Sequence, residues 1–209
     1  MKFYTLLALC FFALSSTAST KAITDEGDVV ILNDNGTWAY EGGEPENEVK
    51  LEMNPSTFST HSDSNFMLKS SKTNAAFWIN PKKWSFKKNE NGHEAAEYTF
   101  NAKGSDLYAM VISEQLEIQL EELVNIAFDN AKDAAPDVQI VKKEYRMVND
   151  HKVIYMEMEG TIQSIKFTYL GYYFSDESGS TQYLTYTGSN LVGKYKEDID
   201  NFLNGFTSQ

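Results

Sequence analysis

An aromatic and basic cluster is the strongest candidate for ligand chemistry in this acidic chain. Trp78 and Trp84 flank Lys82 and Lys83, and two more lysines follow shortly after, although the formal net charge of the chain is −12. Ammonium groups attract anions and indole rings provide stacking surfaces, so this cluster could bind an anionic ligand or partner. Alternatively, the tryptophans belong to the core and the lysines are solvated between them. We take these four residues, together with Trp38, as candidate ligand- or partner-binding residues.

The histidines give no indication of a metal site. His61, His93 and His151 are far apart, and none has a second histidine or a cysteine at the spacing of zinc ligands. The run of residues 33–36 has some likeness to a calcium loop, but Ile31 stands where the EF-hand register requires an acid. A hairpin turn explains this run better. We therefore expect no metal and no bound cofactor.

Nucleophilic catalysis has no recognisable motif here either. The chain contains no G-x-S-x-G sequence, and residues 178–180 (SGS) are typical of a hairpin tip. A hydrolytic site can still assemble from residues that are distant in the sequence. An envelope hydrolase with an unrecognised site therefore stays open as an alternative.

The first 18 residues have the pattern of a secretory signal. Lys2 precedes an apolar run at residues 6–14, and small residues at 16–18 form a cleavage site near Ala18. The apolar run is too short to span a bilayer, so we expect no membrane anchor after cleavage. Cys10, the only cysteine, lies in this segment. The sequence thus predicts a periplasmic or secreted protein without disulfides.

Composition limits the class of partner. The acidic charge opposes long-range attraction to nucleic acids, so we expect none to bind. Hydrophobic residues make up 42% of the chain and aromatic residues 13%, which is ordinary for a folded protein. The expected partner is an unknown protein or small molecule of the envelope.

Two N-terminal segments precede the main domain. Residues 19–40 are predicted to form a β-hairpin, because two β-rich runs flank an Asn-Gly turn. A hairpin alone is marginally stable, so Trp38 must pack on the main domain or on a partner. Residues 41–64 are rich in glutamate, glycine and proline and poor in apolar groups. They are predicted to be an acidic flexible linker.

Residues 65–209 alternate between the periodicities of strands and helices. Apolar positions from Leu116 to Ala131 recur with helical spacing, and a second helix is predicted at 190–206, with Ser189 as its N-cap. The predicted strands are 66–71, 75–80, 83–88, 95–102, 107–113, 138–148, 152–159, 164–174 and 181–187. The last four have short links, which indicates an antiparallel meander. Strand 164–174 is apolar on both faces, so we expect it to be central and covered twice.

This order predicts an α+β fold, in which an antiparallel sheet is packed by two amphipathic helices. Residues 77–84 (FWINPKKW) and 120–123 (LEEL), with the meander and the last helix, resemble the PsbP-like (PsbP/DcrB-type) α/β domain of exported proteins. The resemblance covers about residues 75–206 and implies an accessory or binding role without catalysis. No binding residue of that family maps onto this chain by identity. Residues 27–38 resemble a short hairpin module of some exported bacterial proteins.

Together, these observations predict an exported, non-catalytic binding or accessory protein whose ligand is unknown. The hydrolase is one alternative. An acidic inhibitor or immunity protein that covers a basic effector is the other, because the negative charge suits a cationic partner.

Overall fold

The computed structural model describes residues 20–24, 27, 29–32, 38–40, 51–89 and 95–209. The chain divides into two compact units between Glu48 and Val49. The predicted signal segment and residues 41–50 of the predicted linker lie outside the described residues. Within the described ranges, no helix is long and apolar enough to cross a membrane.

The N-terminal unit contains a three-stranded antiparallel sheet in the order β1-β2-β3. Its strands are β1 (Thr20–Ile23), β2 (Val29–Leu32) and β3 (Trp38–Tyr40). The sequence analysis did not predict β1. The turn at residues 33–37 and the side chains of β3, including that of Trp38, lie outside the described part of the chain.

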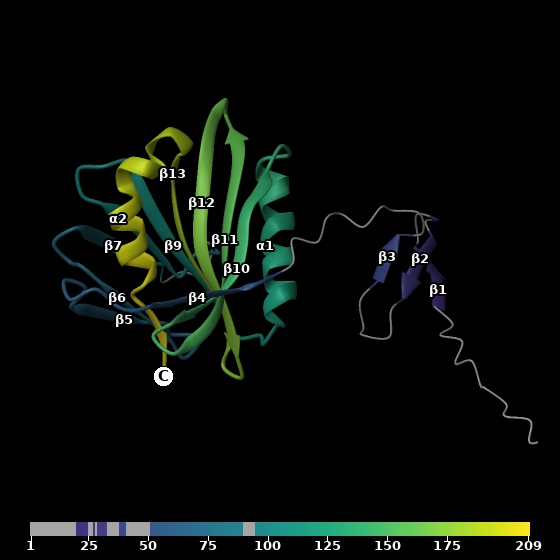
Figure 1. Cartoon of the computed structure of the whole chain (residues 1–209), viewed down its shortest axis with the longest axis horizontal. Helices are drawn as coiled ribbons and strands as arrows, with labels where there is room; N and C mark the ends of the chain where they lie inside the picture. The colour runs from purple at the N-terminus through teal and green to yellow at the C-terminus, as the bar shows by residue number, and fades with distance from the viewer. Residues whose placement is uncertain (1–19, 25–26, 28, 33–37, 41–50, 90–94) are drawn as a thin grey trace, which may run out of the picture. The chain divides into compact units, whose positions relative to one another are not determined.

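The main unit is built on an eight-stranded sheet (Figure 1). From one edge to the other, its strands are β4 (Met53–Phe58), β10 (Gln139–Val148), β11 (His151–Ile162), β12 (Ile165–Asp176), β13 (Gly179–Gly188), β9 (Leu107–Glu114), β8 (Tyr98–Ala102) and β7 (Trp84–Lys88). Neighbouring strands are antiparallel, except that β4 runs parallel to β10. The predicted meander is confirmed as β10 to β13.

The predicted linker is wrong where the structure describes it, because residues 51–64 belong to the main unit. β4 pairs with the edge of β10, and the centre of the Phe58 ring lies 4.6 Å from the guanidinium carbon of Arg146. The backbone hydrogen bonds of β4 come from a strand about ninety residues later, which local composition cannot indicate. Pro55 is compatible with β4 because this strand is at an edge.

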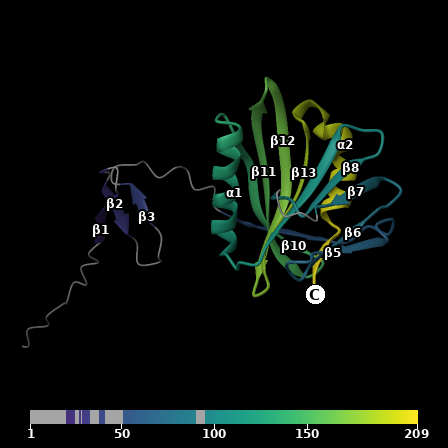
Figure 2. The ribbon, with the colours of Figure 1, turned by 180° about the vertical axis from the view of Figure 1, so that it is seen from behind.

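Helices cover both faces of the central strands (Figures 1 and 2). α1 (Leu120–Ala134) contacts β11 and β12 on one face, and α2 (Val192–Leu203) contacts β12 and β13 on the other. Tyr173 of β12 lies in the core beneath α1, and Tyr172 lies in the core beneath α2. The prediction of a central strand covered twice is therefore confirmed for β12.

A second, three-stranded sheet lies on the α2 side and has the order β14-β6-β5. Its strands are β5 (Phe66–Lys69), β6 (Ala75–Ile79) and β14 (Phe206–Ser208). From the sequence, β5 and β6 were expected in the main sheet. Phe77 of β6 connects the two sheets, because its ring lies 4.8 Å from that of Tyr183 in β13.

The prediction for the last helix is wrong at both ends. A 3₁₀ turn (Ser189–Leu191) precedes α2. Among the described residues, no side chain caps the N-terminus of the 3₁₀ turn or that of α2. The Ser189 hydroxyl, the expected cap, instead accepts a hydrogen bond from Thr168. α2 ends at Leu203, and Gly205 follows it against β6. A Cβ at Gly205 would lie 1.9 Å from the Trp78 carbonyl oxygen, so only glycine allows the chain to turn here into β14.

Candidate functional site

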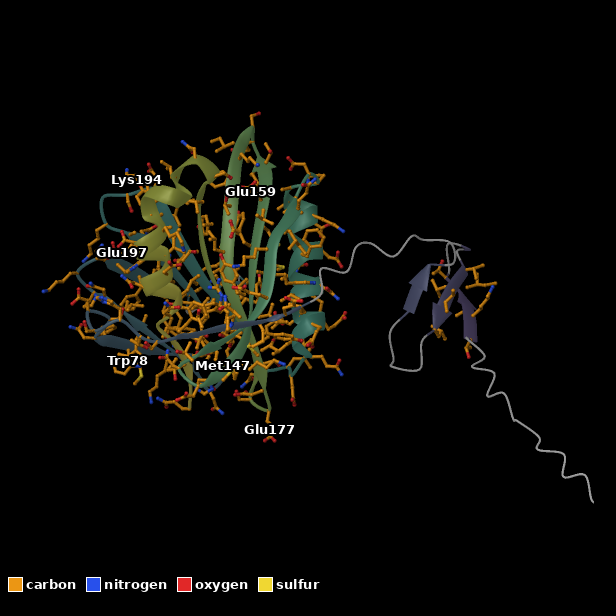
Figure 3. All side chains as sticks on the ribbon, viewed as in Figure 1. Trp78, Met147, Glu159, Glu177, Lys194 and Glu197 are labelled. Carbon is orange, nitrogen blue, oxygen red and sulfur yellow. The ribbon has the colours of Figure 1, made fainter. Side chains whose placement is uncertain are left out.

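The structure separates the aromatic and basic residues singled out from the sequence. Trp84 is 4% exposed and its ring lies 4.2 Å from Phe202, so it belongs to the core. Trp78 is partly exposed on β6, away from α1 (Figure 3). Lys82 and Lys83 are exposed in the turn between β6 and β7. Trp84 is therefore almost completely covered by the core, and the four residues do not form one exposed surface.

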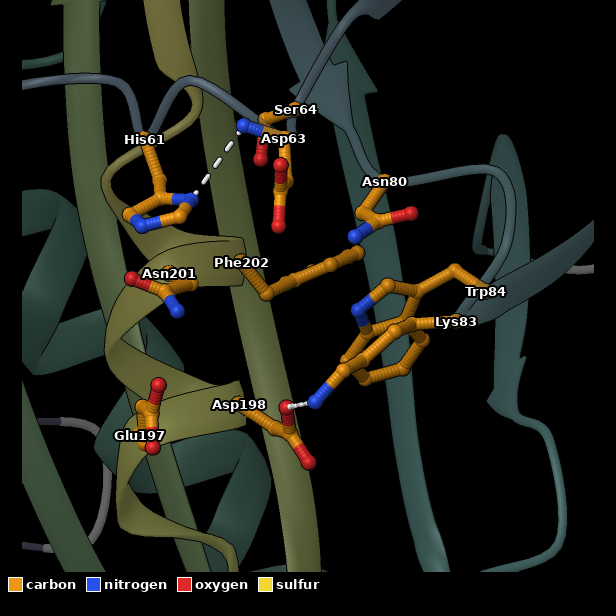
Figure 4. A pocket seen from close by; sticks show the side chains of 10 residues that line it. All are labelled: His61, Asp63, Ser64, Asn80, Lys83, Trp84, Glu197, Asp198, Asn201 and Phe202. Carbon is orange, nitrogen blue, oxygen red and sulfur yellow. Dashed lines mark hydrogen bonds and ion pairs between the residues drawn. The ribbon is translucent and has the colours of Figure 1, made fainter.

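Lys83 and Trp84 line a small polar pocket of about 100 Å³ beside α2 (Figure 4). The Lys83 ammonium pairs with Asp198 of α2, and this hydrogen bond raises the pKa of Lys83. Asp63 and Glu197 also line the pocket. The one lysine is thus neutralised in an acidic surrounding, which makes this pocket a poor site for an anion. In the described ranges, no group of three histidine, cysteine or acidic side chains could hold a metal ion.

A larger cavity lies between α1 and the sheet, and we call it the α1 groove. Its volume is about 360 Å³, which is within the size range of small-molecule sites. Most of its lining is aliphatic or aromatic. The helix contributes Ala127, Ala131 and Ala134, and the strands contribute residues such as Met110, Met158, Tyr169 and Leu184.

The groove arises because α1 presents small side chains to the sheet after its first turns. Leu123 and Val124 fill the space at the start of the helix, where both are nearly fully buried. Further along, three alanines face the strands and leave room. At the end of α1, Gly160 of β11 allows close contact, because a Cβ there would lie 2.9 Å from the Ala135 Cβ. The helix is therefore held at both ends with a cavity between them.

The floor of the groove is formed by part of three aligned rows across β12, β13 and β9, namely by Tyr173, Gln182, Ile112, Leu184, Met110 and Tyr169. From the start of α1 towards its end, the rows are Tyr173–Gln182–Ile112, Gly171–Leu184–Met110 and Tyr169–Tyr186–Tyr108. Leu184 lies over Gly171, where a Cβ would be 2.1 Å from the leucine Cδ2 atom. The middle row is thus apolar, and hydroxyl and amide groups lie on either side of it.

Tyr173 provides an unusual polar group in this apolar cavity. Its side chain is fully buried and lines the groove, yet its hydroxyl has no hydrogen-bond partner among the described residues. Burial raises the pKa of Tyr173, so the hydroxyl stays protonated and can donate a hydrogen bond. Buried hydroxyls in proteins normally have a partner, and leaving one without costs about 1–3 kcal/mol. The structure therefore holds a protonated donor without a partner in the described ranges beneath the lining of the groove.

Three tyrosines form a stacked ladder at the other end of the floor. Ring centroids are 5.5 Å apart between Tyr108 and Tyr186, and 5.4 Å apart between Tyr186 and Tyr169. Burial raises the pKa of Tyr169 and of Tyr186. These two hydroxyls therefore stay protonated, and Tyr169 joins the ladder to the groove.

Replacing Tyr173 with phenylalanine is expected to leave the free energy of unfolding unchanged or to raise it by about 1 kcal/mol, because a buried group without a partner is removed. Tyr183→Phe is the matched control. Tyr183 is equally buried, but its hydroxyl donates to the Phe202 carbonyl at 3.0 Å, so its loss should cost about 1–2 kcal/mol. Urea unfolding measures both values. If both variants lost the same free energy of unfolding, the Tyr173 hydroxyl would have a hydrogen-bond partner, contrary to the prediction.

This site was not predicted from the sequence, because no residue in it forms a motif. The alanines at positions 127, 131 and 134 follow the helical spacing, which indicates a small-residue stripe but not what it faces. Tyr173 was expected to be buried on β12, but an unpartnered hydroxyl depends on every neighbour in space. The rows of the floor depend on the strand register, which only the structure gives.

Comparison with known proteins identifies the fold. No family model matches the chain, and no curated protein matches its sequence. The solution structure of cyanobacterial PsbP (CyanoP) from Synechocystis sp. PCC 6803 superposes with a TM-score of 0.56 at 12% identity, covering 74% of this chain and 98% of that one. The main unit has a PsbP-like fold. This confirms the fold implied by the sequence resemblance.

Two other solved structures are similar to the PsbP-like unit at lower scores. One is a protein from Bacteroides thetaiotaomicron VPI-5482, with a TM-score of 0.46 at 9% identity, covering 70% of this chain and 49% of that one. The other is a protein of unknown function from Pseudomonas aeruginosa, with a TM-score of 0.40 at 8% identity, covering 64% of this chain and 89% of that one.

Proposed function

We propose that this chain is an exported, non-catalytic binding protein that holds a small, mostly apolar molecule in the α1 groove. The observation that carries the proposal is the cavity of about 360 Å³ between α1 and the sheet, whose lining is mostly apolar and includes the polar side chains of Gln182 and Asn130. An apolar cavity with a few oriented polar groups is the usual form of a small-molecule site. The proposed export rests on the N-terminal pattern of Lys2 and the apolar run at 6–14.

The lining supports binding by burial of apolar surface. Met110 and Met158 are flexible and polarizable, so they can adapt to ligands of different shape. Burial of apolar surface contributes about 25 cal/mol per Å², and the partly exposed Gln182 amide would orient a ligand that carries an acceptor. The groove therefore combines an adaptable apolar lining with a polar group that can orient a ligand.

Binding of N-phenyl-1-naphthylamine, an uncharged apolar dye that fluoresces outside water, tests the proposal. The purified protein is expected to bind the dye with one site per chain. Ala131→Phe fills the groove and should weaken binding at least ten-fold. Asn125→Phe, on the exposed side of the same helix, is the matched control and should change affinity less than two-fold.

A second variant that fills the α1 groove shows whether weaker binding by Ala131→Phe comes from misfolding instead. Ala134 also lines the groove but is exposed at its rim, so Ala134→Phe is readily tolerated and should likewise weaken binding. Urea unfolding checks that each variant is folded. Absence of dye binding, or equal binding by the wild type and both folded filling variants, would overturn the proposed function.

A further inference from the structure

The formal charge in the described lining of the α1 groove is exclusively negative. Glu114 is the only formally charged side chain among the described residues that line it, and these include no lysine, arginine or histidine. Glu114 ends β9 and is exposed, so its carboxylate lies at the rim of the cavity rather than in its apolar interior. A ligand bound in the groove therefore meets one negative charge and no compensating positive charge from this lining.

The strand register places this charge at the same end as the polar row of the floor. Glu114 pairs with Ser180, and Ile112, two residues before it on the same face of β9, pairs with Gln182. Gln182 in turn pairs with Tyr173. A carboxylate, an amide and an unpartnered hydroxyl thus follow one another towards the interior, whereas Gly160 and Ile162 line the opposite end.

This arrangement can satisfy some polar head groups and not others. The Gln182 amide can donate to an uncharged oxygen, and the Glu114 carboxylate can accept from a hydroxyl or attract an ammonium group. A ligand carboxylate at the same place would be repelled by Glu114 across a partly apolar medium, where charges interact more strongly than in water. The tyrosine ladder adds no positive charge, because a phenol side chain is neutral when protonated and negative when ionised.

We propose that the α1 groove selects uncharged or cationic amphiphiles over carboxylates of the same length, and that Glu114 makes this selection. The inference rests on the proposed function, because it names the class of ligand that the groove takes. It assigns Glu114 a specificity role at the rim, at the same end of the groove as Gln182.

Three ligands with the same ten-carbon chain test the selection: decanol, decyltrimethylammonium and decanoate. Each is titrated against the protein loaded with N-phenyl-1-naphthylamine, and its affinity is obtained from displacement of the dye. Decanol and decyltrimethylammonium are expected to bind at least ten-fold more tightly than decanoate at pH 7.5 and low salt. The preference for the cation over decanoate should narrow as salt is added, because Glu114 is exposed.

Two matched variants test whether Glu114 causes the preference for the cation over decanoate. Glu114→Gln should reduce the preference for the cation over decanoate about five- to ten-fold, whereas Glu117→Gln should change it less than two-fold. Glu117 is an exposed acid three residues away that does not line the groove, so the net charge changes equally in both variants.

The outcomes separate the inference from the proposed function. Equal displacement by decanoate and the cation in the wild type, or equal effects of the two variants, would overturn the selection while the dye still binds. A dye that does not bind, or that binds regardless of Ala131→Phe and Ala134→Phe, would instead overturn the proposed function itself.

Discussion

Replacement of Arg146 with alanine is expected to lower the free energy of unfolding by about 3–5 kcal/mol, the usual cost of breaking a buried ion pair. The Arg146 side chain is 11% exposed, and its Nε and Nη2 atoms each lie 2.7 Å from Glu144 Oε1. Its guanidinium carbon lies 3.6 Å from the centre of the Tyr155 ring, and Nη1 donates to the Tyr172 hydroxyl at 3.3 Å. Truncation removes these contacts together and leaves the Glu144 carboxylate without its main partner.

Lys142→Ala is the matched control for this prediction. Lys142 pairs with the same carboxylate, Glu144, at 3.1 Å, but its side chain is 48% exposed. Ion pairs of exposed groups contribute about 0–1 kcal/mol, so this variant should lose less than 1 kcal/mol. Urea unfolding at pH 7 measures both variants. A loss below about 1 kcal/mol for Arg146→Ala would show that the buried cation is dispensable.

Asn149→Asp is expected to lower the free energy of unfolding by about 3 kcal/mol at pH 7.5. The reason is that a charged carboxylate replaces an amide whose nitrogen and oxygen both make hydrogen bonds. Asn149 Nδ2 donates to the carbonyl oxygens of Asn204 at 2.9 Å and Phe206 at 2.6 Å. Its Oδ1 accepts from the Thr60 backbone at 2.9 Å. Aspartate keeps this acceptor and tolerates the positive φ of 45°, but it turns a carboxylate oxygen towards two carbonyl oxygens.

The sign of the pH dependence distinguishes this mechanism from a simple loss of contacts. The two carbonyl oxygens would raise the pKa of the introduced carboxyl in the folded state above its unfolded value of about 3.9. The folded state then binds more protons between these two pKa values, so the deficit relative to wild type should grow as the pH rises through that interval. Below about pH 4 the protonated carboxyl can donate again, and the deficit should shrink.

The neighbouring substitution Asp150→Asn is the control, because it makes the reverse change in the same turn. Asp150 is exposed with a φ of 68°, which asparagine also tolerates, so a change within about 0.5 kcal/mol is expected. Urea unfolding of both variants and the wild type between pH 4 and pH 8 gives the differences. A deficit for Asn149→Asp that does not vary with pH would contradict the electrostatic explanation.

Local patterns predicted the elements that depend on neighbours in sequence. The helical stripe that contains Leu123 and the short links of the meander were enough to place α1 and β10 to β13, because periodicity and short turns act within a few residues. Elements that depend on distant partners were missed or misplaced. β4 needs the edge of β10, and β14 needs β6 together with the glycine at position 205.

The candidate site was beyond the reach of sequence patterns for a related reason. Trp84 is conspicuous in the sequence but is used in the core against Phe202. The groove depends on Ala127 and Ala131 facing a floor whose register brings Tyr173 beside Gln182. The cavity beside the alanines and the missing partner of the Tyr173 hydroxyl both depend on how neighbouring residues are arranged in space. Individual residue types do not indicate such an arrangement.

The position of β4 and β7 at the two ends of the sheet bears on how copies of this protein behave towards each other. An outer strand exposes unpaired backbone groups that can recruit another chain and start aggregation. Pro55 removes one such donor from β4, and the exposed Lys87 and Lys88 place positive charges along β7. Lys87 and Lys88, which belong to the basic run in the sequence, thus place charge on an outer strand, where charge opposes pairing with the edge of another chain.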